Sequence, residues 1–171
     1  MKKIMPLEAI LWSIALPGFA QLLSGAYIKG ILFVLLEFLI NVRSRFNEAI
    51  MLSFLGKTVQ AGEIIDYEWL MFYPCLYFFA MWDAFRNSFD HPPKYIFIPF
   101  AFAAYFVTVG LIYSPAAVIK NKPIGPVFFP ILCLIPGLLI GCGIRTILLR
   151  KKASPLKGVH QEKIRRTEKK D

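Results

Sequence analysis

The sequence predicts an all-α, polytopic membrane protein with four or five transmembrane helices. Of its 171 residues, 57% are hydrophobic and 18% are charged, whereas a soluble domain typically has about 45–50% apolar and about 25% charged residues. The mean hydropathy is +0.56. Long uncharged runs alternate with short polar segments, which is the pattern of successive membrane spans of roughly 20 residues each.

Five apolar runs are the expected membrane helices. They cover residues 7–24, 27–42, 69–86, 95–113 and 126–149. A weaker amphipathic pattern over residues 46–56 predicts a helix in the membrane interface, and residues 57–68 are expected to form a polar loop. Residues 1–149 therefore make a single transmembrane helical domain. Residues 150–171 form a basic tail that is either disordered or weakly helical.

The distribution of basic residues predicts the orientation. Nine of the twenty Lys and Arg residues lie between Arg150 and Lys170, and basic segments flanking membrane helices stay in the cytoplasm. We therefore expect a multi-pass protein of the cell (plasma) membrane with a cytoplasmic C-terminus. Counting spans backwards from the tail places the 57–68 loop outside.

The first apolar run has three interpretations, because Pro17-Gly18 interrupts it. It crosses the membrane, it re-enters and leaves on the same side, or it is a cleaved signal peptide with an "LSGA" cleavage region. A crossing would put Lys2 and Lys3 outside, so the charge distribution favours re-entrance.

Polar residues inside the first two apolar runs are the candidate site. The expected intramembrane cluster consists of Ser13, Pro17, Gln21, Glu37 and Asn41. Pro17 has no amide hydrogen, which leaves the Ser13 carbonyl without its helical donor. A hairpin folded near Tyr27 would bring Pro17 level with Glu37. A charge at mid-membrane costs about 2.5–3.5 kcal/mol on insertion scales, so a neutral Glu37 that clamps the two helices together is expected. The alternatives are an ion or proton pathway and a Glu37 that faces water.

Other side chains suggest anchoring rather than chemistry. Asp83 and Arg86 are spaced i, i+3 near a helix end and form a candidate interfacial pair. All three cysteines lie in apolar runs, which is typical of small buried hydrophobes. The sequence has no phosphate-binding loop, nucleophile elbow or metal-ligand spacing, so no catalytic residue, cofactor or metal is expected.

The stretch "PGFAQLLSGAYIKG" resembles the hairpin of small bacterial membrane proteins grouped loosely with the two-helix TM-two domain proteins. The matching residues are Pro17, Gly18, Gln21, Gly25, Tyr27, Lys29 and Gly30. Residues 69–87 resemble a second block of such proteins, whereas Ala20 and Ser24 depart from the usual Gly and polar amide. The resemblance implies a multi-pass membrane protein with no established catalytic residues.

These observations predict a non-catalytic accessory or scaffold protein that binds other membrane components. Its expected partners are the lipid bilayer, anionic lipid at the basic tail, and a membrane protein or a second copy of the chain. Nucleic acid is not expected, because the tail has neither a folded basic face nor interleaved aromatic residues. The alternatives are a small transporter or conduit that uses the intramembrane polar residues, and a membrane enzyme acting on a lipid-linked substrate.

Overall fold

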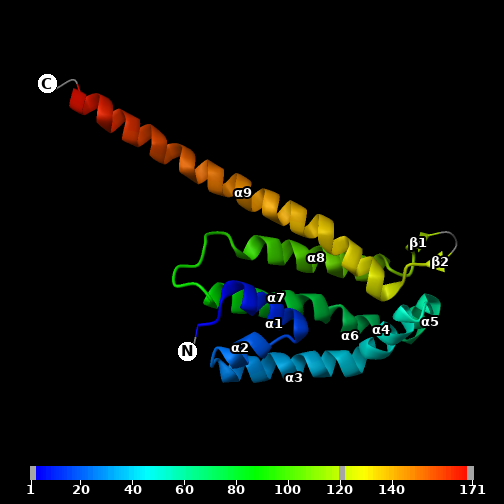
Figure 1. Ribbon diagram of the computed structural model, residues 1–171. Coiled ribbons are helices and arrows are strands. Elements are labelled where there is room, and N and C mark those ends of the chain that lie inside the picture. The colour runs from blue at the N-terminus through cyan, green and yellow to red at the C-terminus, as the bar shows by residue number, and fades with distance from the viewer. Residues whose placement is uncertain (1–2, 120–121, 169–171) are drawn as a thin grey trace.

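The computed structural model describes residues 3–119 and 122–168, with side chains described as far as Lys151, and it is mostly helical as predicted (Figure 1). The helices are α1 (Pro6–Ala15), α2 (Phe19–Leu23), α3 (Tyr27–Ser44), α4 (Phe46–Phe54), α5 (Thr58–Ile64), α6 (Tyr67–Leu70), α7 (Phe72–Asn87), α8 (Phe97–Tyr113) and α9 (Gly125–Glu168). Two short antiparallel strands, β1 (Val118–Ile119) and β2 (Lys122–Pro123), pair between α8 and α9.

The first apolar run is two helices and not the single helix expected over residues 7–24. Helix α1 ends at Ala15, and Leu16 is extended (φ −158°, ψ 121°). Gly18 has φ +97°, a left-handed conformation that glycine adopts without steric cost. The chain therefore reverses at Pro17-Gly18, and α2 leads back to the end from which α1 started. Lys3 and the Ser24–Lys29 turn accordingly line the same cavity.

Helices α3, α7 and α8 lie alongside one another, and the first half of α9 packs on α8 (Figure 1). Helix α3 has 18 residues, α7 has 16 and α8 has 17, so each is about 24–27 Å long. These lengths approach the hydrocarbon thickness of a bilayer, which is about 30 Å. Helix α1, with 10 residues, is about half that length.

Small residues let α8 and α9 pack closely. A Cβ added at Gly141 would lie 2.7 Å from Pro99 Cα, and one added at Gly137 would lie 2.9 Å from the Phe102 carbonyl oxygen. Gly137 and Gly141 form a G-x-x-x-G spacing, which is typical of closely packed helices in membranes. The absence of side chains at these two positions therefore sets the distance between the helices.

Short elements cover one end of the helices, which we call the cap end. The expected helix over residues 46–56 is present as α4, but the expected polar loop over residues 57–68 is wrong, because it folds into α5 and α6. Ala49, Ala61, Leu70 and Leu111 form a buried cluster there, so the loop has its own apolar contacts. The opposite end, which holds Lys3, the α2–α3 turn and the α7–α8 loop, is called the N-terminal end.

Within the described residues, one segment, Gly125–Lys151 of α9, is long and apolar enough to cross a membrane by itself, and 22% of its most apolar 18-residue window is buried. This finding indicates membrane association. The backbone of α9 stays helical to Glu168, so the tail is helical where the sequence left disorder open. The tail's side chains beyond Lys151 and residues 169–171 lie outside the described part of the chain.

Candidate functional site

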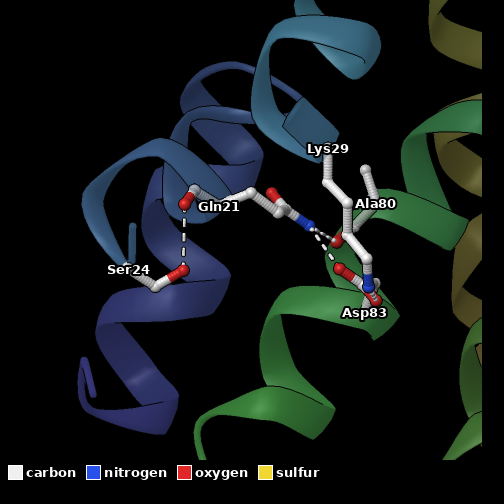
Figure 2. A network of polar contacts seen from close by, with 5 residues as sticks. All are labelled: Gln21, Ser24, Lys29, Ala80 and Asp83. Carbon is white, nitrogen blue, oxygen red and sulfur yellow. Dashed lines mark hydrogen bonds and ion pairs between the residues drawn. The ribbon is translucent and has the colours of Figure 1, made fainter. Parts of the chain in front are cut away.

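A buried polar network joins α2, α3 and α7 at the N-terminal end (Figure 2). Lys29 Nζ donates to Asp83 Oδ1 at 2.7 Å. Gln21 Nε2 donates to Asp83 Oδ2 at 3.2 Å and to the Ala80 carbonyl oxygen at 2.8 Å. We call Gln21, Lys29 and Asp83 the hairpin network. It connects the first 30 residues to α7 through an ion pair and two hydrogen bonds.

The network is buried at one side and open at the other. Gln21 is 1% exposed, and the Asp83 side chain is 11% exposed, whereas the Lys29 side chain is 56% exposed. The carboxylate is therefore held among protein groups, and its cation reaches it from the surface. Lys29 also lines a cavity of about 590 Å³ at the N-terminal end, together with Lys3 and the Ser24–Ala26 turn.

The glycines of residues 17–30 allow α2 and α3 to pack closely. A Cβ at Gly18 would lie 2.5 Å from the Gly30 carbonyl oxygen, and a Cβ at Gly30 would lie 2.5 Å from the Leu22 side chain. Helices α2 and α3 therefore pack closely enough for Gln21 and Lys29 to reach one carboxylate. Gly25 turns the chain between them with φ +83°, a conformation that favours glycine.

A second polar group, which we call the Glu37 cluster, lies farther along α3. It consists of Glu37, Asn41, Asn47 and Tyr73. Glu37 Oε1 accepts from Asn41 Nδ2 at 3.3 Å and from the Tyr73 hydroxyl at 3.4 Å. Asn41 also donates to Asn47 Oδ1 at 3.2 Å and accepts from the Asn47 amide at 3.2 Å, so the cluster spans the α3–α4 junction.

The single cluster expected from the sequence is therefore divided in two. The structure brings Glu37 and Asn41 together, but it places Gln21 in the hairpin network and binds the Ser13 hydroxyl to the Ala9 carbonyl within α1. The expected clamp between Glu37 and the Ser13–Gln21 segment is wrong. Its physical reason is the position of the turn: the chain folds back near Gly25 and not near Tyr27, which moves the facing residues by about one helical turn.

Pro17-Gly18 accordingly faces the first part of α3 instead of Glu37. A Cβ at Gly18 would lie 2.9 Å from Phe33 and 3.1 Å from Val34. The helix break does leave a carbonyl free, but its donor comes from another helix: the Tyr77 hydroxyl of α7 donates to the Ile14 carbonyl oxygen. Pro17 itself is fully buried.

The expected pair between Asp83 and Arg86 is also wrong. Asp83 faces α2 and α3 and pairs with Lys29. The Arg86 guanidinium lies over the Trp82 ring instead, 5.4 Å from its centroid. The spacing would allow Asp83 and Arg86 to meet, but Lys29 and Gln21 already bind the Asp83 carboxylate, and Arg86 packs on Trp82, four residues before it on α7.

Three side chains of these two clusters, Lys29, Tyr73 and Asn47, were not among the candidate site residues expected from the sequence. Lys29 belongs to the motif that carries the family resemblance, and its position beside an apolar run was a usable signal for an ion-pair partner. Tyr73 and Asn47 had no such signal, because each acts through a residue on a different helix.

The polar groups of both clusters bind one another across neighbouring helices. Within the described residues, no three His, Cys, Asp or Glu side chains lie close enough to hold a metal ion. The carboxylates of both clusters already accept hydrogen bonds from neighbouring donors. Gln21 Oε1 is a buried acceptor with no partner among these residues.

Comparisons of the chain with protein-family profiles, curated proteins and solved structures found no match.

Proposed function

We propose that this protein is a non-catalytic, multi-pass membrane scaffold whose N-terminal hairpin is re-entrant. The observation that carries the proposal is the hairpin network. It uses its polar groups to fix α1 and α2 against α3 and α7. A polar residue in a membrane helix that bonds to another helix serves helix association. The Glu37 cluster supports the same interpretation, because its carboxylate is engaged by Asn41 and Tyr73.

In this proposal, α3, α7, α8 and α9 cross the membrane and the α1–α2 hairpin enters from the cytoplasmic side and returns. The charges at the two ends support this orientation. The N-terminal end and the adjoining part of α9 carry Lys3, Lys29, Arg86, Lys94, Arg145, Arg150 and Lys151 against Glu8, Asp83 and Asp90. The cap end carries Arg43, Arg45, Lys57 and Lys122 against Glu48, Glu63, Asp66 and Glu68. The more basic end is the one that stays in the cytoplasm.

Irregular backbone also fits this proposal. Non-helical segments at membrane depth are tolerated only where protein covers them. Pro17 and Gly18 are both buried, and the free Ile14 carbonyl is bound by Tyr77. We also propose that the chain is related to the TM-two domain proteins. In such a relative, the opening hairpin would be a structural element.

The orientation is tested by labelling in intact cells. In a variant whose three cysteines are replaced by alanine, a cysteine at Gln60 of α5 is expected to react with an impermeant thiol reagent. A cysteine at Asn87, at the other end, is expected to react only after lysis. A reporter fused after Lys170 should be active in the cytoplasm. The reverse pattern at Gln60 and Asn87 would overturn the orientation.

The scaffold function is tested against the conduit alternative. Proteoliposomes that contain the full chain are expected to show the same proton and cation leak as protein-free vesicles, and Glu37→Gln should leave this leak unchanged. Purification in mild detergent should retain a membrane protein or a second copy in stoichiometric amount, and Gly18→Val, which disrupts the hairpin, should lose it. If the vesicles leak only when Glu37 is present, and no partner is retained in stoichiometric amount, the conduit hypothesis would replace the scaffold hypothesis.

A further inference from the structure

An apolar groove lies between α7 and α8. Its volume is about 370 Å³, which is within the range of small-molecule sites. It is lined by Cys75, Phe78, Trp82, Phe97, Phe100 and Ala104, with hardly any polar surface. Of the ring-bearing residues nearby, Phe79 and Phe97 are more than half exposed, so protein does not fill the groove.

The groove has a defined direction. It extends along α7 from Trp82 to Cys75 and along α8 from Phe97 to Ala104, which is about 10 Å in each helix. Trp82 and Phe97 lie towards the N-terminal end, next to the α7–α8 loop. The groove therefore covers about two-thirds of the depth of one leaflet, which is about 15 Å.

A cation lies at the end of the groove that is nearest the loop. Arg86 is exposed, and its guanidinium is 5.4 Å from the centroid of the Trp82 ring that lines the groove. No carboxylate of the described residues pairs with it, because Asp83 binds Lys29 and Asp90 binds Lys3. A guanidinium presents donors in a planar fork that suits a phosphate group.

We propose that this groove binds one anionic phospholipid of the cytoplasmic leaflet, with an acyl chain between α7 and α8 and the headgroup phosphate at Arg86. The proposal rests on the membrane topology proposed above. Charge complementarity selects the lipid class, because the groove itself is apolar and Arg86, which forms no ion pair with a described carboxylate, lies at its entrance. The indole nitrogen of Trp82 is buried, so Arg86 supplies the headgroup contact. This site is separate from the basic tail.

The test uses Trp82 as a reporter of the lipid in the groove. The full chain with Trp12→Phe and Trp69→Phe retains Trp82 as its tryptophan, and it is reconstituted in vesicles that contain brominated phosphatidylglycerol or brominated phosphatidylcholine. Quenching of Trp82 is expected to show an about fivefold preference for phosphatidylglycerol, the value for one basic residue near an anionic surface. Equal quenching by both lipids would overturn the proposal.

Three variants separate the headgroup contact from general charge. Arg86→Gln should abolish the preference, and Arg86→Lys should keep most of it. Arg145→Gln, which removes one charge at the same end but from α9, should leave it unchanged. If Arg86→Gln retains the full preference, or if Arg145→Gln abolishes it equally, the site at Arg86 does not exist.

A fourth variant tests the acyl chain. Ala101 lines the groove and is exposed, so Ala101→Phe fills the groove without displacing a buried side chain. Quenching of Trp82 by either brominated lipid should fall at least twofold. Unchanged quenching would show that the chain lies outside the groove.

A separate measurement distinguishes this failure from failure of the topology. Trp12 of α1 is 40% exposed, and a variant that retains only Trp12 should be quenched by brominated phosphatidylcholine. If Trp12 is quenched and Trp82 shows no preference, the lipid site alone is overturned. If neither tryptophan is quenched, the membrane proposal fails and the lipid site fails with it.

Discussion

Replacement of Lys29 by methionine removes the cation of the hairpin network and keeps the length of the side chain. Asp83 would lose the contact at 2.7 Å and retain the one from Gln21 at 3.2 Å. Breaking a buried ion pair by removing one partner costs about 3–5 kcal/mol, whereas an exposed pair contributes about 0–1 kcal/mol. Asp83 is 11% exposed and Lys29 is 56% exposed, so we expect an intermediate loss of about 2 kcal/mol.

The assay is thermal unfolding of the purified full chain in mild detergent. For a protein of this size, about 1 kcal/mol corresponds to a shift in Tm of about 2–4 °C, so Lys29→Met should lower Tm by about 4–8 °C. The matched control is Glu48→Gln, which breaks the Arg45–Glu48 pair on the surface, where both side chains are about half exposed. A local pair on a helix surface contributes about 0.3–0.5 kcal/mol, so this control should shift Tm by no more than about 2 °C.

A double-mutant cycle isolates the interaction. Asp83→Leu removes the carboxylate and leaves Gln21 bound to the Ala80 carbonyl at 2.8 Å. Once Asp83 is leucine, adding Lys29→Met should cost little, because Lys29 has lost its partner. The coupling energy should therefore be about 1–3 kcal/mol. Strictly additive losses, or a Lys29→Met variant as stable as the wild type, would refute the reasoning from the ion pair.

Three further predictions follow from the glycines and from Glu37, and each is measured by Tm and by cellular abundance. Gly18→Ala should destabilise the protein by at least about 2 kcal/mol, because Gly18 has a left-handed φ and the added Cβ would lie 2.5 Å from a backbone oxygen. The control Gly56→Ala should cost only about 1 kcal/mol, because Gly56 has φ +76° but open space around it. Equal losses for the two variants would show that close packing at Gly18 is unimportant. Gly141→Ala should destabilise the protein by about 1–2 kcal/mol, because the added Cβ would lie 2.7 Å from the backbone of α8. The control Gly143→Ala, where the space is open, should stabilise the helix by up to about 1 kcal/mol. A stabilising Gly141→Ala would contradict the close packing of α8 against α9. Glu37→Gln should be nearly neutral and Glu37→Leu should cost about 1–2 kcal/mol, because leucine leaves amide and phenol donors unpaired; a neutral Glu37→Leu would show that the Glu37 cluster contributes nothing.

Hydropathy predicted most of the fold because it reports on long apolar helices. The runs over 69–86 and 95–113 became α7 and α8 within a few residues, since a helix buries or exposes whole turns of apolar side chains. Helices α5 and α6 were missed because they have only seven and four residues, and Trp69 and Leu70 of α6 were assigned to the apolar run that follows. They are stabilised by contacts from distant segments, such as the bond from the Thr58 hydroxyl to the Pro123 carbonyl oxygen at 2.7 Å.

The site was less predictable, because its partners are far apart in the sequence. Gln21 and Asp83 are separated by 62 residues, and helical periodicity orders residues only within one helix. The sequence did identify Gln21 and Glu37 as polar groups that need partners inside an apolar helix, and it identified Asp83 as one half of an ion pair near a helix end. It assigned the wrong partners because a shift of two residues in the position of a turn moves the facing positions by about four.

The stability of the hairpin depends on contacts outside it. Helix α2 has five residues, and helices shorter than about 12 residues are marginal without tertiary packing. Its fold is held by the close approach of Gly18 to α3 and by Gln21, which bonds to two acceptors on α7. The same contacts cover the non-helical backbone at Pro17. Hairpin formation is therefore coupled to the packing of α3 against α7, and a change at Asp83 should expose backbone at Pro17 even though the two residues share no bond.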